Sequence, residues 1–433
     1  MNNWILLVTL GFLLATFYIL GGRKIIASCI FVLSYLVPIT VVIFYSDITR
    51  HELSDETVLI ILAFAISFFV GEVLVCHKVR LSKSISPIHC YDIKKEFLFV
   101  FYIIQLLNLW FSYRFIMAVG AEMGANNFIS AYAATRIFLV RETDIQVPVP
   151  SYYTLIGLLS IAIEILCVHI YILNKLYFSR KEQKKILGVV VLYFMALMLN
   201  TGRAALFPPI IHIVYLFMIV AQRKMGKSFS LRKYKKTIVS SVIAGMIVFV
   251  ALGTAREDKQ GEGEVEIQGT YWLTAYIGAP IVGLDLYINK GMPPYNNIGA
   301  HTFQHVHMLL GKLGFPTGKE DFKNENFYFG EVTSNVKSAI YYWISDFGLL
   351  GALLFTFVLG GMYGLIDKIK DKRLSLMNII GISYISSMYF ALLMIFFCSE
   401  FYSLFSYGLV ESYLIVYLMQ KKCLKIHNIG VDK

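Results

Sequence analysis

The chain has 433 residues, of which 57% are hydrophobic and only 15% charged, and it carries a formal net charge of +11. A composition this apolar excludes a soluble globular enzyme of the same length and predicts a membrane protein. Most of the excess basic residues stand beside the ends of apolar segments, where anionic lipid head groups attract them. We therefore expect membrane lipids, and no nucleic acid, as partners.

Apolar segments recur along the whole chain, and about eleven of them approach the roughly 20 residues that a helix needs to cross a bilayer. Their ranges are 4–20, 25–45, 57–76, 97–120, 152–174, 186–200, 204–221, 237–253, 338–365, 376–397 and 404–420. None alternates apolar and polar residues as a membrane barrel would. We predict an all-α polytopic bundle, with residues 1–433 as a single integral membrane domain. The first segment has no cationic leader or cleavage site before it, so we expect it to be retained as the first helix.

The orientation of the bundle follows from its basic residues, which gather in alternate connections. These connections lie around 23–24, 78–95, 175–185, 223–236, 368–373 and 421–433. By the positive-inside rule they are cytoplasmic, which places the N-terminus outside and the C-terminus inside. The alternation holds only if the apolar run 186–221 forms two helices, so Arg203 is expected at an outward-facing turn.

Two longer connections are predicted on the outer side. The first, 121–150, contains the segment 128–140, whose mixed pattern around Tyr132 and Arg136 is typical of a surface-lying amphipathic helix. The second, 254–337, is the longest hydrophilic region, and we expect it to be the substrate region because long loops are usually functional. Its apolar stretch 270–288 is interrupted by glycine and proline, which favours a segment that lies in the interface or re-enters the bundle, or simple loop packing.

Arg203 stands in the stretch LNTGRAALFPPIIH, residues 199–212, inside an otherwise apolar run. A guanidinium near hydrocarbon is costly unless it pairs, snorkels or faces water, and its fork of donors matches phosphate oxygens. Helix-breaking residues before it leave amides at the start of the next helix, which also favours an anion. The stretch therefore predicts an anion site at the outer surface, with snorkelling to lipid head groups as the alternative.

Further polar and aromatic residues are predicted on the same side. Arg136, Arg141 and Arg256 complete a set of outer arginines, although Arg141 beside Glu142 is typical of a solvated side chain and Arg256 beside Glu257 and Asp258 of a local ion pair. His301 and His305 have the i, i+4 spacing of one helix face, which suits a polar cleft, ordinary interfacial histidines or, less well, a metal. Asp346, early in a long apolar helix, is expected to pair with an arginine or to act as a base. Tyr271 and Trp272 fit either an aromatic belt or stacking on sugar rings.

Three passages carry a resemblance to a known family. They are NTGR at 200–203, the pair YWLTAYIGAPIVGLDLYI and GAHTFQHVHMLLGKLG in the long loop, and NVKSAIYYWISDFGLLGALLFTFVLGGMYG at 335–364. Over roughly residues 190–365 the chain resembles the oligosaccharide repeat-unit polymerases, the Wzy family of O-antigen and capsular polysaccharide polymerases. The first half is similar only in hydropathy and helix count.

The resemblance implies a glycosyltransferase of the bacterial cytoplasmic membrane, multi-pass, that uses undecaprenyl-pyrophosphate-linked glycans and needs no cofactor or metal. It implies functional arginines in the outer loops, which Arg203 and Arg256 match best and Arg136 less well. It also implies partners in the same pathway, a chain-length regulator and a flippase. The acceptor hydroxyl needs a base, for which the outer candidates are His301, His305, His307, Asp285, Asp346 and Glu400.

Two other functions remain open from the sequence. A related ligase would move a finished glycan to another acceptor with the same donor chemistry. A transporter or lipid flippase would show paired repeats with charges at the bilayer midplane. The sequence has no internal repeat, and its polar residues gather at one predicted face, which favours the polymerase.

Overall fold

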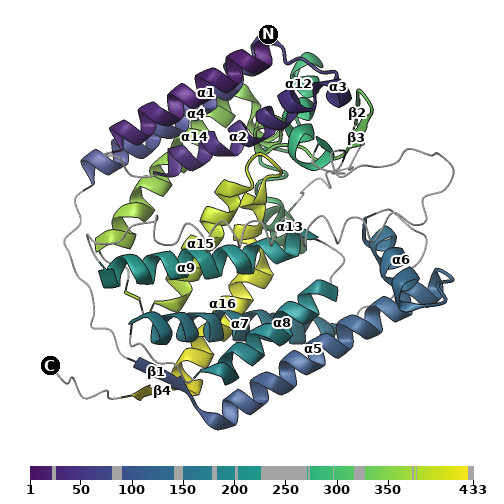
Figure 1. Cartoon of the computed structure of the whole chain (residues 1–433), viewed down its shortest axis with the longest axis vertical. Coiled ribbons are helices and arrows are strands. Elements are labelled where there is room, and N and C mark those ends of the chain that lie inside the picture. Colours follow the sequence, from purple (N-terminus) through teal and green to yellow (C-terminus); the bar gives the residue numbers. More distant parts are fainter. Residues whose placement is uncertain are drawn as a thin grey trace. The chain divides into compact units, whose positions relative to one another are not determined.

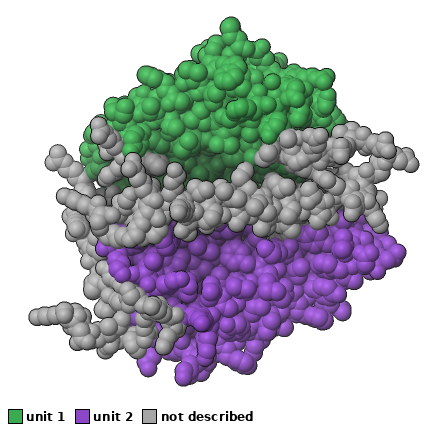
Figure 2. All heavy atoms as spheres, viewed as in Figure 1, with its two compact units in different colours: residues 1–85, 262–374, 388–406 green, residues 86–261, 375–387, 407–433 purple. Residues whose placement is uncertain are grey.

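The computed structural model describes residues 1–21, 26–79, 90–140, 150–177, 183–199, 203–225, 271, 274–295, 297–315, 327–372, 375–376 and 378–427. Helices dominate these residues (Figure 1). The chain divides into two compact units that alternate along the sequence (Figure 2). Unit 1 comprises 1–85, 262–374 and 388–406, and unit 2 comprises 86–261, 375–387 and 407–433.

Six of the described helices are long and apolar enough to cross a membrane. They are α1 (Asn2–Leu20), α2 (Ala27–Phe44), α4 (Asp55–Lys78), α5 (Lys95–Glu122), α7 (Ser151–Tyr177) and α14 (Ala339–Lys372). The predicted all-α membrane class is thereby confirmed. Four other helices, α8 (Lys184–Leu199), α9 (Phe207–Met225), α15 (Ile379–Leu393) and α16 (Tyr407–Cys423), also fall on predicted segments. The predicted segment 237–253 lies outside the described residues, and the count of eleven crossings stays a prediction.

The helix pair α4 and α14 forms the centre of unit 1, and the two run alongside each other (Figure 1). Glycines allow the close approach: a Cβ on Gly71 would lie 1.9 Å from the Phe357 carbonyl oxygen, and one on Gly360 would lie 1.9 Å from that of Phe68. Ser54 precedes α4 as its N-cap, and its side chain accepts a hydrogen bond from the amide of Thr57. Acidic residues follow in its first turn and basic ones stand in its last, as the helix dipole favours.

Helix α14 is broken at Gly348, where φ is 67° and ψ is 170°. A side chain disfavours this conformation, so glycine permits the break. The carbonyls that the break releases are used by the loop that precedes α13 (Gln304–Lys312): Tyr295 donates its amide to the Ser345 oxygen at 2.8 Å, and Gly299 donates to the Asp346 oxygen at 3.2 Å. The sequence predicts one continuous apolar helix here, whereas the structure has a short helical segment followed by a membrane-length one.

The apolar stretch of the long loop is helical and buried within unit 1. A π-helical turn, η3 (Thr274–Gly278), leads into α12 (Ala279–Asn289), and both contact α2. The hairpin of β2 (Phe327–Phe329) and β3 (Val332–Ser334) contacts η3 and turns at Gly330. The Glu331 amide donates to the carbonyl of Ile48, next to the short helix α3 (Ser46–Thr49). The stretch is thus folded into the helices of unit 1.

Unit 2 is built on α7, which packs against α5, α8, α9 and α16. A two-stranded antiparallel sheet joins β1 (Cys90–Ile93), just before α5, to β4 (Leu424–His427), just after α16. Asn174 near the end of α7 donates to the Tyr91 carbonyl at 2.7 Å. The predicted amphipathic segment is the helix α6 (Phe128–Val140), and the short helix η1 (Arg203–Leu206) precedes α9.

Candidate functional site

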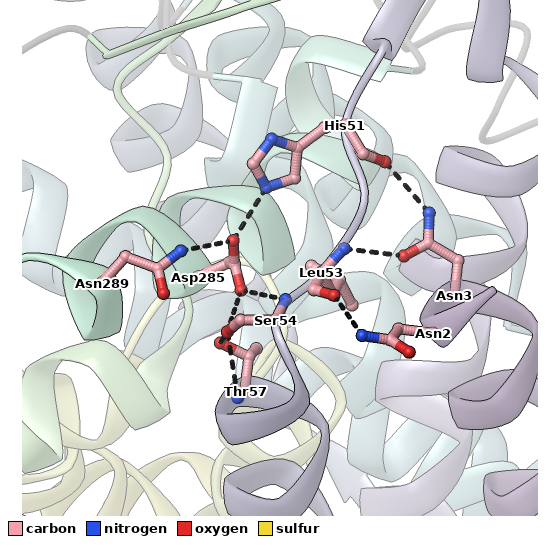
Figure 3. Close-up of polar contacts among 8 residues, drawn as sticks. All are labelled: Asn2, Asn3, His51, Leu53, Ser54, Thr57, Asp285 and Asn289. Atoms are coloured by element: carbon pink, nitrogen blue, oxygen red, sulfur yellow. Dashed lines mark hydrogen bonds and ion pairs between the residues drawn. The ribbon is translucent and has the colours of Figure 1, made fainter.

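Asp285 on α12 is the centre of a buried polar network (Figure 3). Its carboxylate accepts hydrogen bonds from the Ser54 amide at 2.8 Å and the Ser54 hydroxyl at 2.7 Å. His51 Nε2 lies 2.9 Å from one carboxylate oxygen, and Asn289 on the same helix donates at 3.0 Å. The side chain of Asp285 is only 1% exposed. A buried carboxylate with four donors is ionised and held in place.

The pKa of Asp285 follows from these bonds. Burial by itself raises the pKa of a carboxyl, but hydrogen bonds from His51, Thr57 and Ser54 outweigh it and lower the pKa to about 2. A carboxylate with so low a pKa is a weak proton acceptor at neutral pH. Asp285 therefore serves better as an anchor for the start of α4 than as the general base for which the sequence made it a candidate.

The first residues of the chain join the same network. Asn3 donates its side-chain amide to the His51 carbonyl at 3.0 Å and accepts from the Leu53 amide at 3.0 Å. Asn2 donates to the Leu53 carbonyl at 2.8 Å. Figure 3 shows the two asparagines on one side of the 51–54 segment and Asp285 on the other. The network thus fixes three segments that are far apart in sequence.

Asp346 organises a second cluster at the break of α14. One carboxylate oxygen accepts from the His301 amide at 2.9 Å and the other from the Thr302 amide at 2.7 Å. The sequence leads us to expect an arginine partner or a free base, but backbone amides take both oxygens. Asp346 consequently ties the histidine segment to the point where the membrane-length part of α14 begins.

Aromatic rings surround the two predicted histidines. The His301 ring stacks on Tyr342 with centroids 3.8 Å apart and an interplanar angle of 18°, and its edge meets Tyr402 at 5.5 Å. The His305 ring lies 5.8 Å from that of Tyr402. Helix α13 begins only at Gln304, so His301 precedes it and the two histidines do not share a helix face as the spacing predicts. Tyr402, in the short helix η4 (Glu400–Phe405), brings them together instead.

The protonation states of this cluster follow from burial. Desolvation lowers the pKa of His301 to about 4, and it also lowers the pKa of His305. Both imidazoles are therefore neutral at pH 7. Burial raises the pKa of the nearby Glu400, whose carboxyl accepts from the Cys398 thiol at 3.1 Å. The described residues include no group of three histidine, cysteine or carboxylate side chains placed to hold a metal ion.

The remaining predicted residues are distributed as follows. The Tyr271 hydroxyl accepts from the Thr333 amide at 3.4 Å, which ties it to the hairpin. Arg136 lies in α6 and Arg203 begins η1, and only their backbone positions are described. The Tyr132 hydroxyl donates to the Met198 carbonyl at 3.2 Å, so the helix that carries Arg136 contacts the end of the helix that precedes Arg203. Arg141, Arg256 and Trp272 lie outside the described residues.

Sequence reasoning missed Tyr402, which contacts both histidines. Its signal is weak, because it stands in the connection between two apolar helices of an aromatic-rich chain. Ser54 was also missed, although a serine followed by two acidic residues before an apolar run is an ordinary helix-start pattern.

Compared with known protein families, with curated proteins and with solved structures, the chain matches none of them. The fold defines the class, a helical protein with several membrane-length apolar helices. A more specific function has to be argued from the residues.

Proposed function

We propose that the chain is a polymerase that joins undecaprenyl-pyrophosphate-linked repeat units into a surface polysaccharide, O-antigen or capsule. It works at the outer face of the bacterial cytoplasmic membrane as a multi-pass protein. The observation that carries the proposal is the break of α14 at Gly348, where Asp346 holds His301 and Thr302 at the end of a membrane-length helix. In membrane proteins, sites for polar substrates are often formed where a helix is interrupted and its backbone groups are no longer paired within the helix.

The contacts within unit 1 support the predicted alternation of sides. The N-terminus, the connection 45–56 and the long loop 254–337 are all assigned to the outside by the positive-inside rule. Asn3, His51 and Asp285, one from each, belong to the same network. Tyr402 comes from another connection assigned to the outside, and it contacts His301 of the long loop.

In unit 2, connections that the basic residues assign to the cytoplasm likewise contact one another. Strand β1 precedes α5 and β4 follows α16, and the two pair in one sheet. Lys224 at the end of α9 donates to the Leu176 carbonyl at the end of α7 at 2.6 Å. Segments assigned to one side of the membrane thus meet each other, which favours the predicted alternation of sides. The positive-inside rule then assigns the N-terminus to the outside and the C-terminus to the inside.

The chemistry divides into a leaving group and an acceptor. The bond between the anomeric carbon of the growing glycan and its pyrophosphate breaks, and the carrier departs as undecaprenyl pyrophosphate with the bonding electrons. Arginines such as Arg203, Arg136 and Arg256 would stabilise that negative charge without a metal. A sugar hydroxyl of the incoming repeat unit forms the new glycosidic bond. Its proton passes to a base, for which His305 is the better candidate, because a pKa of about 4 makes the His301 imidazole a weak proton acceptor at neutral pH.

The alternatives differ in their products. A ligase-type glycan transferase would transfer a glycan once to a different acceptor, and a flippase would move the lipid-linked glycan without breaking a bond. The polymerase is favoured over a flippase because histidines, among them the candidate base His305, stand beside the helix break, whereas a flippase needs no proton acceptor.

The test is an extension assay with purified protein in liposomes and lipid-linked repeat units. Wild type should build a ladder of chains. Arg203→Lys and Arg203→Ala, compared at equal folded abundance, should both lose the ladder, since a point charge does not replace the bidentate fork. Arg50→Lys is the matched control, because Arg50 is exposed and pairs with Glu331 in the hairpin.

Each other outcome has a defined meaning. Wild type that translocates the substrate without extending it contradicts the proposal in favour of a flippase, and a single transfer to another acceptor points to a ligase. If wild type makes a ladder and both Arg203 variants do so equally well, Arg203 is only a surface anchor. The pyrophosphate contact must then be sought at Arg256 and the histidine segment.

A further inference from the structure

Helix α13 and the residues that follow it display an apolar surface. None of the residues of α13 is buried, and the large apolar side chains of this region are exposed: Val306, Met308, Leu309, Leu313 and Phe315. Helical spacing places Val306, Leu309 and Leu313 on one side, and Gln304 and His307 on another. An exposed apolar surface of this kind marks an interaction site rather than a solvated face.

The depth of α13 relative to a bilayer is fixed by its attachment to α14. The amides of His301 and Thr302 are bound by Asp346, and the Phe303 ring meets that of Phe347 at 6.2 Å. From Leu349 to Asp367 the helix then rises about 28 Å at 1.5 Å per residue, close to the roughly 30 Å of a hydrocarbon core. Lysines follow at the far end. The break, and with it α13, therefore stands at the level of the membrane interface.

The surface of α14 after the break at Gly348 indicates what covers the exposed apolar side of α13. Leu350, Leu354, Val358 and Met362 follow each other at i, i+4 spacing and are all exposed, Leu350 to 83%. Such a stripe on a membrane-length helix faces lipid tails. The residues that lead into α13 contact Asp346 and Phe347, just before this stripe begins at Leu350. Because a lipid-facing stripe starts at the point of attachment, the same bilayer is the cover that we assign to the exposed side chains of α13.

We propose that α13 is an interfacial helix that inserts Val306, Leu309 and Leu313 into the outer leaflet of the membrane. In this position the helix holds His301 and His305 at the level of the lipid head groups. A lipid-linked substrate would carry its pyrophosphate at that same level, so the proposal also explains how the histidine cluster meets such a substrate. The insertion itself requires only a bilayer and does not depend on the polymerase activity.

The test uses the full chain in lipid nanodiscs. Single-cysteine variants in a background without the six native cysteines carry a nitroxide at Leu309 or Leu313. Collisions with dissolved oxygen and with a water-soluble nickel chelate are then measured by power saturation. Leu354→Cys is the lipid-facing control and Glu331→Cys the water-facing control. At positions 309 and 313 the nitroxide should collide more often with oxygen than with the nickel chelate, as it should at position 354.

Two results would overturn the proposal. If labels at 309 and 313 collide with the nickel chelate as often as the label at 331 does, the helix lies in water. If their collisions with both oxygen and nickel are rare, the helix lies against protein. If the cysteine-free background does not fold, wild-type protein is photo-crosslinked in nanodiscs made with diazirine-bearing lipid. Adducts should then map to 306–315 as well as to 350–362, and adducts confined to 350–362 contradict the insertion.

Discussion

Asp285 illustrates how a single side chain organises the face on which we place the substrate. It joins the N-terminal asparagines, the start of α4 and α12 through hydrogen bonds made inside the protein. The energetic significance of such a carboxylate lies in the donors it satisfies, because each buried donor left without an acceptor costs free energy.

Replacement of Asp285 by alanine should therefore lower stability. The Ser54 amide, the Ser54 hydroxyl and His51 would lose their acceptor, and each buried donor left unsatisfied costs about 1–3 kcal/mol. Thermal unfolding in detergent measures the change. Glu331→Gln is the control, since its pair with Arg50 is exposed and surface pairs contribute at most about 1 kcal/mol. Equal melting temperatures of the two variants would refute the anchoring role.

The same residue gives a pH dependence. The pKa of Asp285 falls from its ordinary 3.8 in the unfolded chain to about 2 in the folded protein. The ionised carboxylate therefore contributes fully to the stability of the fold at a pH above the unfolded pKa. That contribution is lost as the pH falls from about 4 towards about 2, because the folded state must then take up the proton it excluded. Melting temperatures of wild type and Asp285→Asn across this window should converge. A difference that stays constant would show that the carboxylate is not the titrating group.

At the level of elements, two glycine positions on facing helices set the separation of α4 and α14. A Cβ at Gly71 or Gly360 would overlap a carbonyl oxygen of the partner helix. Gly71→Ala and Gly360→Ala should each cost about 1–3 kcal/mol, the usual cost of overpacking a tight contact. Gly11→Ala in α1 is the matched control: no heavy atom lies within 4 Å of its added Cβ, so stability should hold or rise. Equal effects at all three positions would exclude the packing explanation.

The break of α14 makes a separate prediction. Gly348→Ala either strains the backbone by about 1–3 kcal/mol or straightens the helix, which would take the Ser345 and Asp346 carbonyls away from the 295–299 loop. In both cases polymer formation should fall with stability. The extension assay and thermal unfolding are compared with Leu350→Ala, an exposed neighbour. If Gly348→Ala matches that control in both, the break does not support the site.

The sequence predicts the positions of the long helices better than it predicts where a helix is broken or which strands pair. Apolar runs mark the positions of the long helices, because hydropathy and length are local properties. The break at Gly348 and the pairing of β1 with β4 were not predicted, since amides of the 295–299 loop stabilise the first and the C-terminal residues provide the second. At the candidate site, the sequence singles out His301, His305 and Asp346, but the shared helix face of the two histidines and the arginine partner of Asp346 are not what the structure has. Their partners, Tyr402 and the backbone amides, depend on tertiary contacts that no local pattern encodes.

At the scale of the whole molecule, the chain alternates between two units, so segments from distant parts of the sequence complete each of them. Within each unit the connecting segments that meet are those that the basic residues assign to the same side. In unit 1 this agreement supports placing the histidine cluster on the side assigned to the outside, where the proposed joining of lipid-linked glycan would take place.

The most direct test of that activity is the stoichiometry of the reaction. Purified protein in liposomes receives repeat units labelled on the sugar and on the polyprenyl carrier, and the free carrier pyrophosphate is counted against the glycosidic bonds formed. A polymerase should release one carrier for each bond as a ladder of chains grows. Movement of labelled substrate across the bilayer without any released carrier would contradict the proposed function and identify the protein as a transporter.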